Sequence, residues 1–250
     1  MNVAVEAAQQ AGRFLSKHFD QSIQIERKKD HSLVTNIDKE SENIIVNAIR
    51  KSFPSHSLLA EESGEQRGNE YLWLIDPLDG THNFIRGIQM YGVCIGLVHR
   101  DEFVGGVIYL PSTDELYCAE RGSGAFKNGK PLKVSNCSDL KEATLLFDSG
   151  MSEGGEEKLG LLGRMAHRFF NIRMLGASCR NMSYLAEGKA DVLIEFDEKP
   201  WDFAAGAAIL LEAGGVICGH RGETVNVKSK KFVASNPLIN LELRKLITTV

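Results

Sequence analysis

Apolar residues recur at helical spacing in two segments near the N-terminus of this chain. The first segment runs from Val3 to Leu15. The second follows Asp38 and ends before Pro54, which cannot continue a helix. Residues 20–36, which separate the two segments, are polar and irregular and predict no regular element. The chain is therefore expected to begin with two amphipathic helices, each with one apolar face to bury.

Short apolar runs follow, and turn residues separate them. They predict five strands, at residues 57–60, 72–76, 91–99, 103–109 and 115–120. Because the connections are as short as those of hairpins, we expect this sheet to be antiparallel. The glycine-rich residues 122–129 predict a turn between strands.

Helical and extended patterns alternate in the second half of the chain. Helices are expected at residues 159–170, 178–187 and 202–213 and from Pro237 onward, and strands at residues 172–175, 191–195, 216–218 and 232–234. This alternation indicates layers of helices and sheets, so the fold class is α+β or layered α/β. Ser, Gly and Glu are frequent at residues 136–158, where we place the boundary between two subdomains of one compact unit, residues 1–140 and 141–250.

Composition narrows the class of protein. The chain has 250 residues, of which 43% are hydrophobic and 25% charged, as in a soluble globular protein. Its net charge of -4, without a basic block at either end, argues against nucleic acid as the main partner. No apolar run is long enough to cross a membrane, and no signal peptide is evident. The five scattered cysteines lack CxxC spacing, which favours a reducing compartment, and we expect a cytoplasmic protein.

Acidic residues stand at four places where predicted elements begin or end. They are Glu61 and Glu62 after one strand, Asp76 and Asp79 after the next, and Asp38 and Asp202 at the starts of helices. Asp is common in turns and at helix N-caps, so each place taken alone also has a purely structural explanation. Four such places in one chain favour a cluster of carboxylates, which repel one another unless cations neutralise them.

The composition of the cluster favours magnesium as the cation. All candidate ligands are oxygen donors, and no His and Cys residues have the spacing of a zinc site. Two Mg²⁺ ions about 4 Å apart would form a hydrolytic centre with substrate phosphate oxygens. A helix that begins near Gly80 and Thr81 would direct backbone N–H groups toward a phosphate. P-loop, dinucleotide-binding and G-x-S-x-G motifs are absent from the sequence.

Several motifs together resemble the inositol monophosphatase family, within the superfamily of magnesium-dependent, lithium-sensitive phosphatases. The resemblance covers nearly the whole chain, and it rests on Val34-Thr35 with Asp38, Glu61 to Ser63, Trp73 to Thr81, Gly122 to Phe126, and Trp201-Asp202 with Glu212 to Gly215. It implies the sugar-phosphatase fold of fructose-1,6-bisphosphatase and inositol monophosphatase, with alternating α-β-α-β-α layers. Residues 1–140 would then hold most metal ligands, and residues 141–250 would supply Asp202 and a substrate loop.

The resemblance also implies a role for each matching residue, with two or three Mg²⁺ ions per active site. The metal ligands would be Glu61, Asp76, the Leu78 carbonyl, Asp79 and Asp202, and Glu61 would also contact a third, weaker ion. Thr81, oriented by Asp38, would position and help to deprotonate the attacking water, and Glu61 and Asp79 would complete the catalytic set. The substrate would contact Leu78, Asp79, Gly80, Thr81, Gly176, Ala177, Ser178, Glu195 and Asp202. Among these, the backbone N–H groups of Gly80 and Thr81 would bind the phosphate, and Glu195 a substrate hydroxyl.

Three departures from the family pattern concern the choice of substrate. Ser32 stands where the family commonly has Asp, and Ser178 ends a loop that often ends in Ala. His82 occupies a variable position. None of the three is among the metal ligands that the resemblance implies.

We therefore expect an enzyme, a magnesium-dependent phosphomonoesterase that acts on a small polyol phosphate, most simply inositol 1-phosphate. Hydrolysis would proceed by direct in-line attack of metal-activated water. One alternative is the same chemistry on fructose 1,6-bisphosphate, histidinol phosphate or 3′-phosphoadenosine 5′-phosphate. Another alternative is a regulatory binding protein on the same fold. By resemblance we also expect a homodimer that is sensitive to lithium and requires neither nucleic acid nor a membrane.

Overall fold

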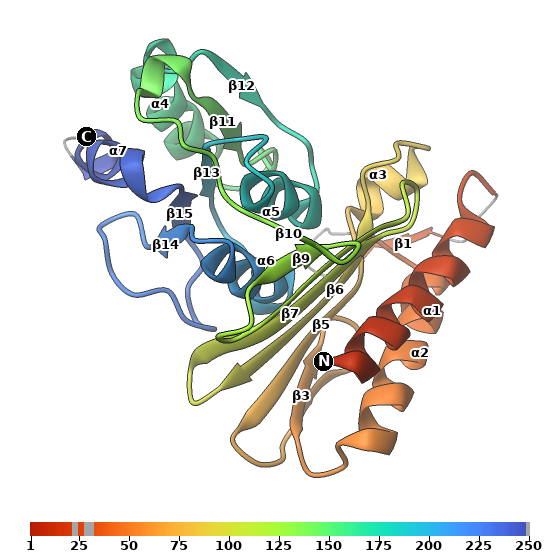
Figure 1. The fold of residues 1–250 in the computed structure, drawn as a ribbon. Coiled ribbons are helices and arrows are strands. Elements are labelled where there is room, and N and C mark those ends of the chain that lie inside the picture. The colour runs from red at the N-terminus through yellow and green to blue at the C-terminus, as the bar shows by residue number, and fades with distance from the viewer. Residues whose placement is uncertain (22–24, 28–32, 249–250) are drawn as a thin grey trace.

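The computed structural model describes residues 1–21, 25–27 and 33–248, which form alternating layers of helices and sheets (Figure 1). The helices are α1 (Asn2–His18), α2 (Asn36–Ser52), α3 (Thr81–Ile85), α4 (Gly155–Met165), α5 (Ser178–Ala186), α6 (Pro200–Glu212) and α7 (Pro237–Thr248). Helices α1 and α2 cover one face of a large sheet, and α5 and α6 lie between that sheet and a smaller one. Helices α4 and α7 cover the outer face of the smaller sheet, which confirms the expected α-β-α-β-α layers.

The larger sheet has eight strands. They are β3 (Ser57–Ala60), β4 (Gly64–Gln66), β5 (Tyr71–Asp79), β6 (Gly92–His99), β7 (Glu102–Leu110), β8 (Glu115–Glu120), β9 (Ala125–Lys127) and β10 (Lys130–Pro131), in the spatial order β10-β9-β8-β7-β6-β5-β3-β4. Neighbouring strands are antiparallel except β3 and β5, which run parallel. The expectation of a wholly antiparallel sheet is wrong there, because β4 folds back on one side of β3 and the chain then returns as β5 on the other side.

The smaller sheet has five strands. They are β11 (Thr144–Phe147), β12 (Asn171–Arg173), β13 (Val192–Glu195), β14 (Val216–Cys218) and β15 (Phe232–Ser235), in the spatial order β12-β11-β13-β15-β14. Strand β11 runs parallel to both of its neighbours, whereas β15 runs antiparallel to both of its own. Strand β11 lies within the stretch where we expected the boundary between subdomains. Its three consecutive apolar residues, Leu145 to Phe147, are too few to show the period of a helix or a strand, so the sequence did not predict it.

Some short elements differ from the expected ones. Residues 20–36 contain β1 (Ile25–Arg27) and β2 (Leu33–Thr35), which pair antiparallel, so the expectation of no regular element there is wrong. Three-residue strands are too short to show a period. Helix α4 ends earlier than expected and continues as the 3₁₀ turn η2 (Ala166–Arg168), and a second 3₁₀ turn, η1 (Leu140–Glu142), precedes β11. Ser32 lies outside the described residues.

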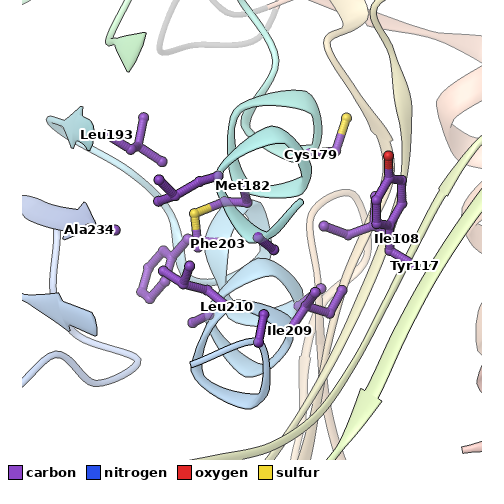
Figure 2. Close-up of a cluster of buried hydrophobic side chains, with 14 of the residues drawn as sticks. Ile108, Tyr117, Cys179, Met182, Leu193, Phe203, Ile209, Leu210 and Ala234 are labelled. Carbon is purple, nitrogen blue, oxygen red and sulfur yellow. The ribbon is translucent and has the colours of Figure 1, made fainter. Parts of the chain in front are cut away.

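The middle layer is buried because it is covered by a sheet on each face. In Figure 2, Met182 of α5 and Phe203 of α6 lie between Ile108 of the larger sheet and Leu193 of the smaller one. Helix α6 is buried throughout from Phe203 to Leu210, and therefore lacks the polar face that α1 and α2 turn to solvent. Among the described residues, no helix is both long and apolar enough to span a lipid bilayer.

Helix α6 packs tightly against the larger sheet at Gly106 of β7. A Cβ atom at this position would lie 2.2 Å from the backbone oxygen of Ala205, so only glycine fits. This close contact holds α6 against β6 and β7 and brings its first turn, with Asp202, to the end of β5.

Candidate active site

The turn at the end of β5 places two carboxylates at one edge of the larger sheet. Asp76 is buried, and its Oδ1 accepts a hydrogen bond from the Leu78 N–H at 3.0 Å. The register of β5 against β6 shifts between Asp76 and Asp79, so the chain leaves the regular ladder there. The Ser41 hydroxyl of α2 donates to the Pro77 carbonyl at 2.8 Å and anchors the turn to the first helical layer.

Asp79 is held by the N-terminus of α5. The backbone N–H groups of Ser178 and Cys179 donate to its two carboxylate oxygens at 3.2 and 2.6 Å. N–H groups in the first turn of a helix have no partner within the helix, and they favour a negative charge. Burial nevertheless raises the pKa of Asp79. These two hydrogen bonds bring the loop that contains Gly176 and Ala177 to the end of β5.

Thr81 begins α3 and shares its hydroxyl with a buried acid. Its Oγ1 lies 3.2 Å from Asp38 Oδ1 and 2.9 Å from the Leu78 carbonyl oxygen, so it can donate to either. Asp38 Oδ2 accepts from both the backbone N–H and the hydroxyl of Thr35. The N-cap of α2 is therefore Thr35, and Asp38 closes a capping box instead of being the N-cap itself. Burial raises the pKa of Asp38 in spite of these hydrogen bonds.

Asp202 reaches the site from the first turn of α6. It accepts a hydrogen bond from the Lys199 N–H at 2.8 Å. The N-cap is Lys199, and Asp202 is the third residue inside the helix, so the explanation of Asp202 as an N-cap is also wrong.

Glu61 reaches the site from the end of β3, the strand that runs beside β5. The carboxylate of Glu42, a buried residue of α2, accepts hydrogen bonds from the N–H groups of Glu62 and Ser63 at 2.7 and 2.8 Å. These hydrogen bonds order the turn that carries Glu61.

One pocket of about 410 Å³ lies between these elements. Its lining includes the expected residues Glu61, Asp76, Leu78, Asp79, Gly80, Thr81, Gly176, Ala177, Ser178, Glu195 and Asp202. Asp38 does not line the pocket and acts on it through Thr81. The structure thus brings together the expected metal ligands and substrate contacts from both halves of the chain, whereas Glu62, which the sequence also indicated, does not line the pocket.

The acids in this pocket disfavour ionisation of one another. Burial raises the pKa of Asp76 well above its usual value, and repulsion from Glu61, Asp79 and Asp202 raises it further. Burial also raises the pKa of Asp202 far above its usual value, and Asp79 and Glu61 add to that shift. A bound cation would reverse this balance, because it favours the ionised form of each carboxylate.

The donor set fits a hard divalent cation. Four carboxylates and the Leu78 carbonyl supply oxygen ligands, the type that Mg²⁺ prefers. Within the described residues, no three acidic, His or Cys side chains form a preformed metal cage. Magnesium keeps several waters and binds substrate phosphate oxygens, so it requires fewer protein ligands at one point than a closed zinc site does.

The pocket also contains residues that the sequence did not single out. They are Asp148, Ser149, Gly150, Asn181 and Glu198. Asp148 directly follows β11, just as Glu61 follows β3, so the same rule would have found it if β11 had been predicted. Glu198 lies in the irregular segment between β13 and α6, where no sequence pattern distinguishes it from a solvated acid.

Comparison with known proteins agrees with this architecture. The model of the inositol monophosphatase family matches residues 1–249. The chain is 35% identical over 251 residues to the fructose-1,6-bisphosphatase/inositol-1-monophosphatase of Thermotoga maritima, and the match covers 100% of this chain and 96% of that protein. It is 37% identical over 243 residues to the Nus factor SuhB of Vibrio cholerae, covering 95% and 91% of the two chains. The chain therefore belongs to the inositol monophosphatase family and is a phosphatase of that family.

Solved structures show the same fold. The extragenic suppressor protein suhB from Bartonella henselae superposes with a TM-score of 0.95 at 34% identity, and the match covers 99% of this chain and 97% of that one. An IMPase/NADP phosphatase solved as a complex with Mg²⁺ and phosphate superposes with a TM-score of 0.83 at 25% identity, covering 95% and 90%.

Proposed function

We propose that the chain is a magnesium-dependent phosphomonoesterase whose substrate is a small polyol phosphate, most simply inositol 1-phosphate. The observation that carries the proposal is the convergence of Glu61, Asp76, Asp79 and Asp202 on one pocket beside the Thr81 hydroxyl. A phosphomonoester resists attack because its anionic oxygens repel nucleophiles. Cations bound by these oxygen ligands would neutralise the phosphate charge and so reduce the repulsion, and the Thr81 hydroxyl lies beside them to position the nucleophile.

The ligand assignments follow the pocket lining. Glu61, Asp76 and the Leu78 carbonyl would hold one ion, and Asp76, Asp79 and Asp202 a second, with Glu61 also available to a third. Bound Mg²⁺ would neutralise phosphate charge and lower the pKa of a bound water. The family relative solved with Mg²⁺ and phosphate supports the choice of metal.

Thr81 and Asp38 would prepare the nucleophile. With the Leu78 carbonyl committed to a metal ion, Thr81 Oγ1 would donate its hydrogen bond to the buried carboxylate of Asp38, which leaves the lone pairs of Oγ1 available to accept a hydrogen bond from a water. That water would be oriented for in-line attack and would lose its proton toward Thr81. The backbone N–H groups of Gly80 and Thr81 would bind the phosphate. Glu195, with the loop from Gly176 to Ser178, would bind the alcohol portion of the substrate.

The test is phosphate release from a panel of phosphomonoesters with Mg²⁺ and with EDTA. We expect inositol 1-phosphate to be hydrolysed only with Mg²⁺. Fructose 1,6-bisphosphate belongs in the panel, because a relative's name joins its hydrolysis to that of inositol 1-phosphate. Histidinol phosphate and 3′-phosphoadenosine 5′-phosphate complete the panel as the other two alternative substrates. Failure to release phosphate from any member of the panel, with the protein folded, would refute the proposal.

A regulatory binding role is the second candidate, and it is favoured by the relatives that are named Nus factor SuhB. An Asp79→Asn variant separates the two roles, because it removes a proposed metal ligand. Rescue of a deletion strain by this inactive variant would support the regulatory role, whereas failure of rescue would support the enzyme. By resemblance we also propose a homodimer, to be tested by light scattering, and inhibition by lithium, to be tested in the phosphate-release assay.

A further inference from the structure

A second pocket, of about 580 Å³, lies beside the smaller sheet between α4, the C-terminal end of α7 and the residues that follow β14. We name it the outer pocket. On α4 it is lined by Glu157, Leu161 and Arg164, which stand four and three positions apart and therefore share one face of the helix. Within the described part of the chain, the outer pocket shares no lining residue with the active-site pocket, so it is a separate cavity.

The lining of the outer pocket carries positive charge. Arg164 and Arg221 both line it and are exposed, and among the residues that the structure describes neither guanidinium has an ion pair or a hydrogen bond. Glu157 is neutralised by Lys231, whose Nζ lies 2.7 Å from both of its carboxylate oxygens. Glu223 accepts a hydrogen bond from the Arg221 backbone N–H at 3.0 Å and does not line the pocket. Two guanidinium groups therefore remain available to an anion.

The rest of the lining is largely apolar. Leu161, Phe196 and Ile247 line the outer pocket, and each of them is buried against the remainder of the protein. Pockets that combine apolar side chains with a few charged groups are typical of sites for organic molecules. An inorganic ion would satisfy the two guanidinium groups but would leave this apolar surface in contact with water, whereas an organic anion would cover both.

Two consecutive residues at the end of β13 join the outer pocket to the active site. Glu195 lines the active-site pocket, and Phe196 lines the outer pocket. His220, also in the outer pocket, donates from Nε2 to the Glu195 carbonyl oxygen at 3.2 Å, and its ring meets the Phe196 ring edge-on at 4.8 Å between centroids. Lys158 Nζ lies 5.6 Å from the centre of the Phe196 ring and 2.7 Å from Oδ2 of Asp148, which lines the active site. A ligand that moves Phe196 or His220 would therefore move groups that contact active-site residues.

We propose that the outer pocket binds a small organic dianion, whose carboxylate or phosphate groups pair with Arg164 and Arg221, and that its occupancy alters hydrolysis in the active site. A guanidinium forms bidentate pairs with either group, so the recognition chemistry is the same for both. Occupancy alters hydrolysis to the extent that the ligand favours one arrangement of Phe196 and His220 over another. The binding site is independent of the proposed phosphatase function, whereas the effect on hydrolysis rests on it.

Binding is measured by titration calorimetry on the full-length protein with EDTA, because the active-site acids then lack cations and repel anions. The probes are phthalate, which carries two carboxylates, and phenylphosphonate, which stands in for a phosphate and cannot be hydrolysed; uncharged phthalamide is the control ligand. We expect at least one dianion to bind one-to-one and phthalamide not to bind. Arg164→Gln and Arg221→Gln should each weaken binding by roughly 10-fold or more, because each removes a charge-assisted hydrogen bond. Arg67→Gln, which removes an exposed guanidinium beside Glu65, should bind as wild type does.

Failure of both dianions to bind wild type, or equal binding by wild type and both arginine variants, would overturn the anion site.

Phosphate release with Mg²⁺ tests the effect on hydrolysis. The dianion that binds more tightly should change kcat/KM of wild type by roughly 5-fold or more, and the double variant Arg164→Gln/Arg221→Gln should lose this response. Competition at the active site, or capture of Mg²⁺ by the probe, would affect both proteins alike and would overturn the effect on hydrolysis. Binding that leaves kcat/KM of wild type unchanged would overturn it too, while the anion site would stand. If no ester is hydrolysed, the proposed function and the effect on hydrolysis both fail, and calorimetry still decides the anion site.

Discussion

Asp38→Asn tests whether the buried acid behind Thr81 serves catalysis or only folding. The asparagine oxygen can replace Oδ2 and accept from the N–H and hydroxyl of Thr35. Its NH₂ group then faces Thr81 Oγ1, which can accept from it and donate to the Leu78 carbonyl at 2.9 Å. Every hydrogen bond is therefore preserved, but Thr81 loses the acceptor that draws its proton away from the pocket.

The two effects of this substitution differ in size. Exchanging charged for neutral hydrogen bonds weakens each one, whereas removing a buried charge with a raised pKa is favourable, so we expect stability to change by less than about 1 kcal/mol. Loss of a positioned proton acceptor typically lowers turnover by roughly 10²–10⁴-fold, or about 3–5 kcal/mol in the activation barrier.

The assay is phosphate release with Mg²⁺, together with urea unfolding of the same preparations. Asp101→Asn is the matched control. Asp101 is exposed and adopts a φ of 66°, a conformation that asparagine tolerates, so neither activity nor stability should change. Turnover within a few-fold of wild type in Asp38→Asn, at native stability, would refute the proposed role of Asp38. If the turnover of Asp38→Asn falls only in proportion to its folded fraction in the urea titration, the acid serves the fold alone.

Three further predictions follow from the same contacts. Folding raises the pKa of Glu195 from 4.5 to about 8, because the buried side chain holds its proton more tightly in the folded state. The contribution of Glu195 to stability is therefore fully present below pH 4.5 and is lost as the pH rises through about 8. The free energy of unfolding of Glu195→Gln, minus that of wild type, should therefore increase as the pH rises from 4.5 to 9, by at most about 5 kcal/mol. Urea titrations with EDTA measure this difference, and parallel pH profiles for the two proteins would contradict the prediction. Mg²⁺ should raise the Tm of wild type by mass action and should do so far less in Asp79→Asn, as measured by calorimetry; equal shifts would exclude Asp79 as a ligand. Gly106→Ala should cost roughly 1–3 kcal/mol because its Cβ would meet the Ala205 backbone at 2.2 Å, whereas Gly163→Ala, with nothing within 4 Å, should not destabilise the protein.

Local patterns in the sequence were sufficient to predict the main helices and strands. The apolar run that ends at Asp76, the turn at Pro77 and the helix that begins near Thr81 all depend on neighbours a few residues apart, and each is present. The periodic segments before and after residues 20–36 likewise became α1 and α2. Acids at the ends of such elements were a sufficient signal to predict which carboxylates line the pocket, and their role as metal ligands stays a proposal.

Tertiary structure decided what those local patterns could not. Asp38 and Asp202 looked like N-caps, because a carboxylate at a helix start has the same local sequence whether it caps the helix or faces a pocket. The first turn of α5 holds Asp79 through hydrogen bonds that span about a hundred residues, and no spacing in the chain encodes them. Glu198 became part of the site only when α6 packed against the larger sheet. Hydrophobic periodicity reports which face of an element is buried, whereas the neighbours of a side chain depend on how the layers pack, and that information exists only in the folded chain.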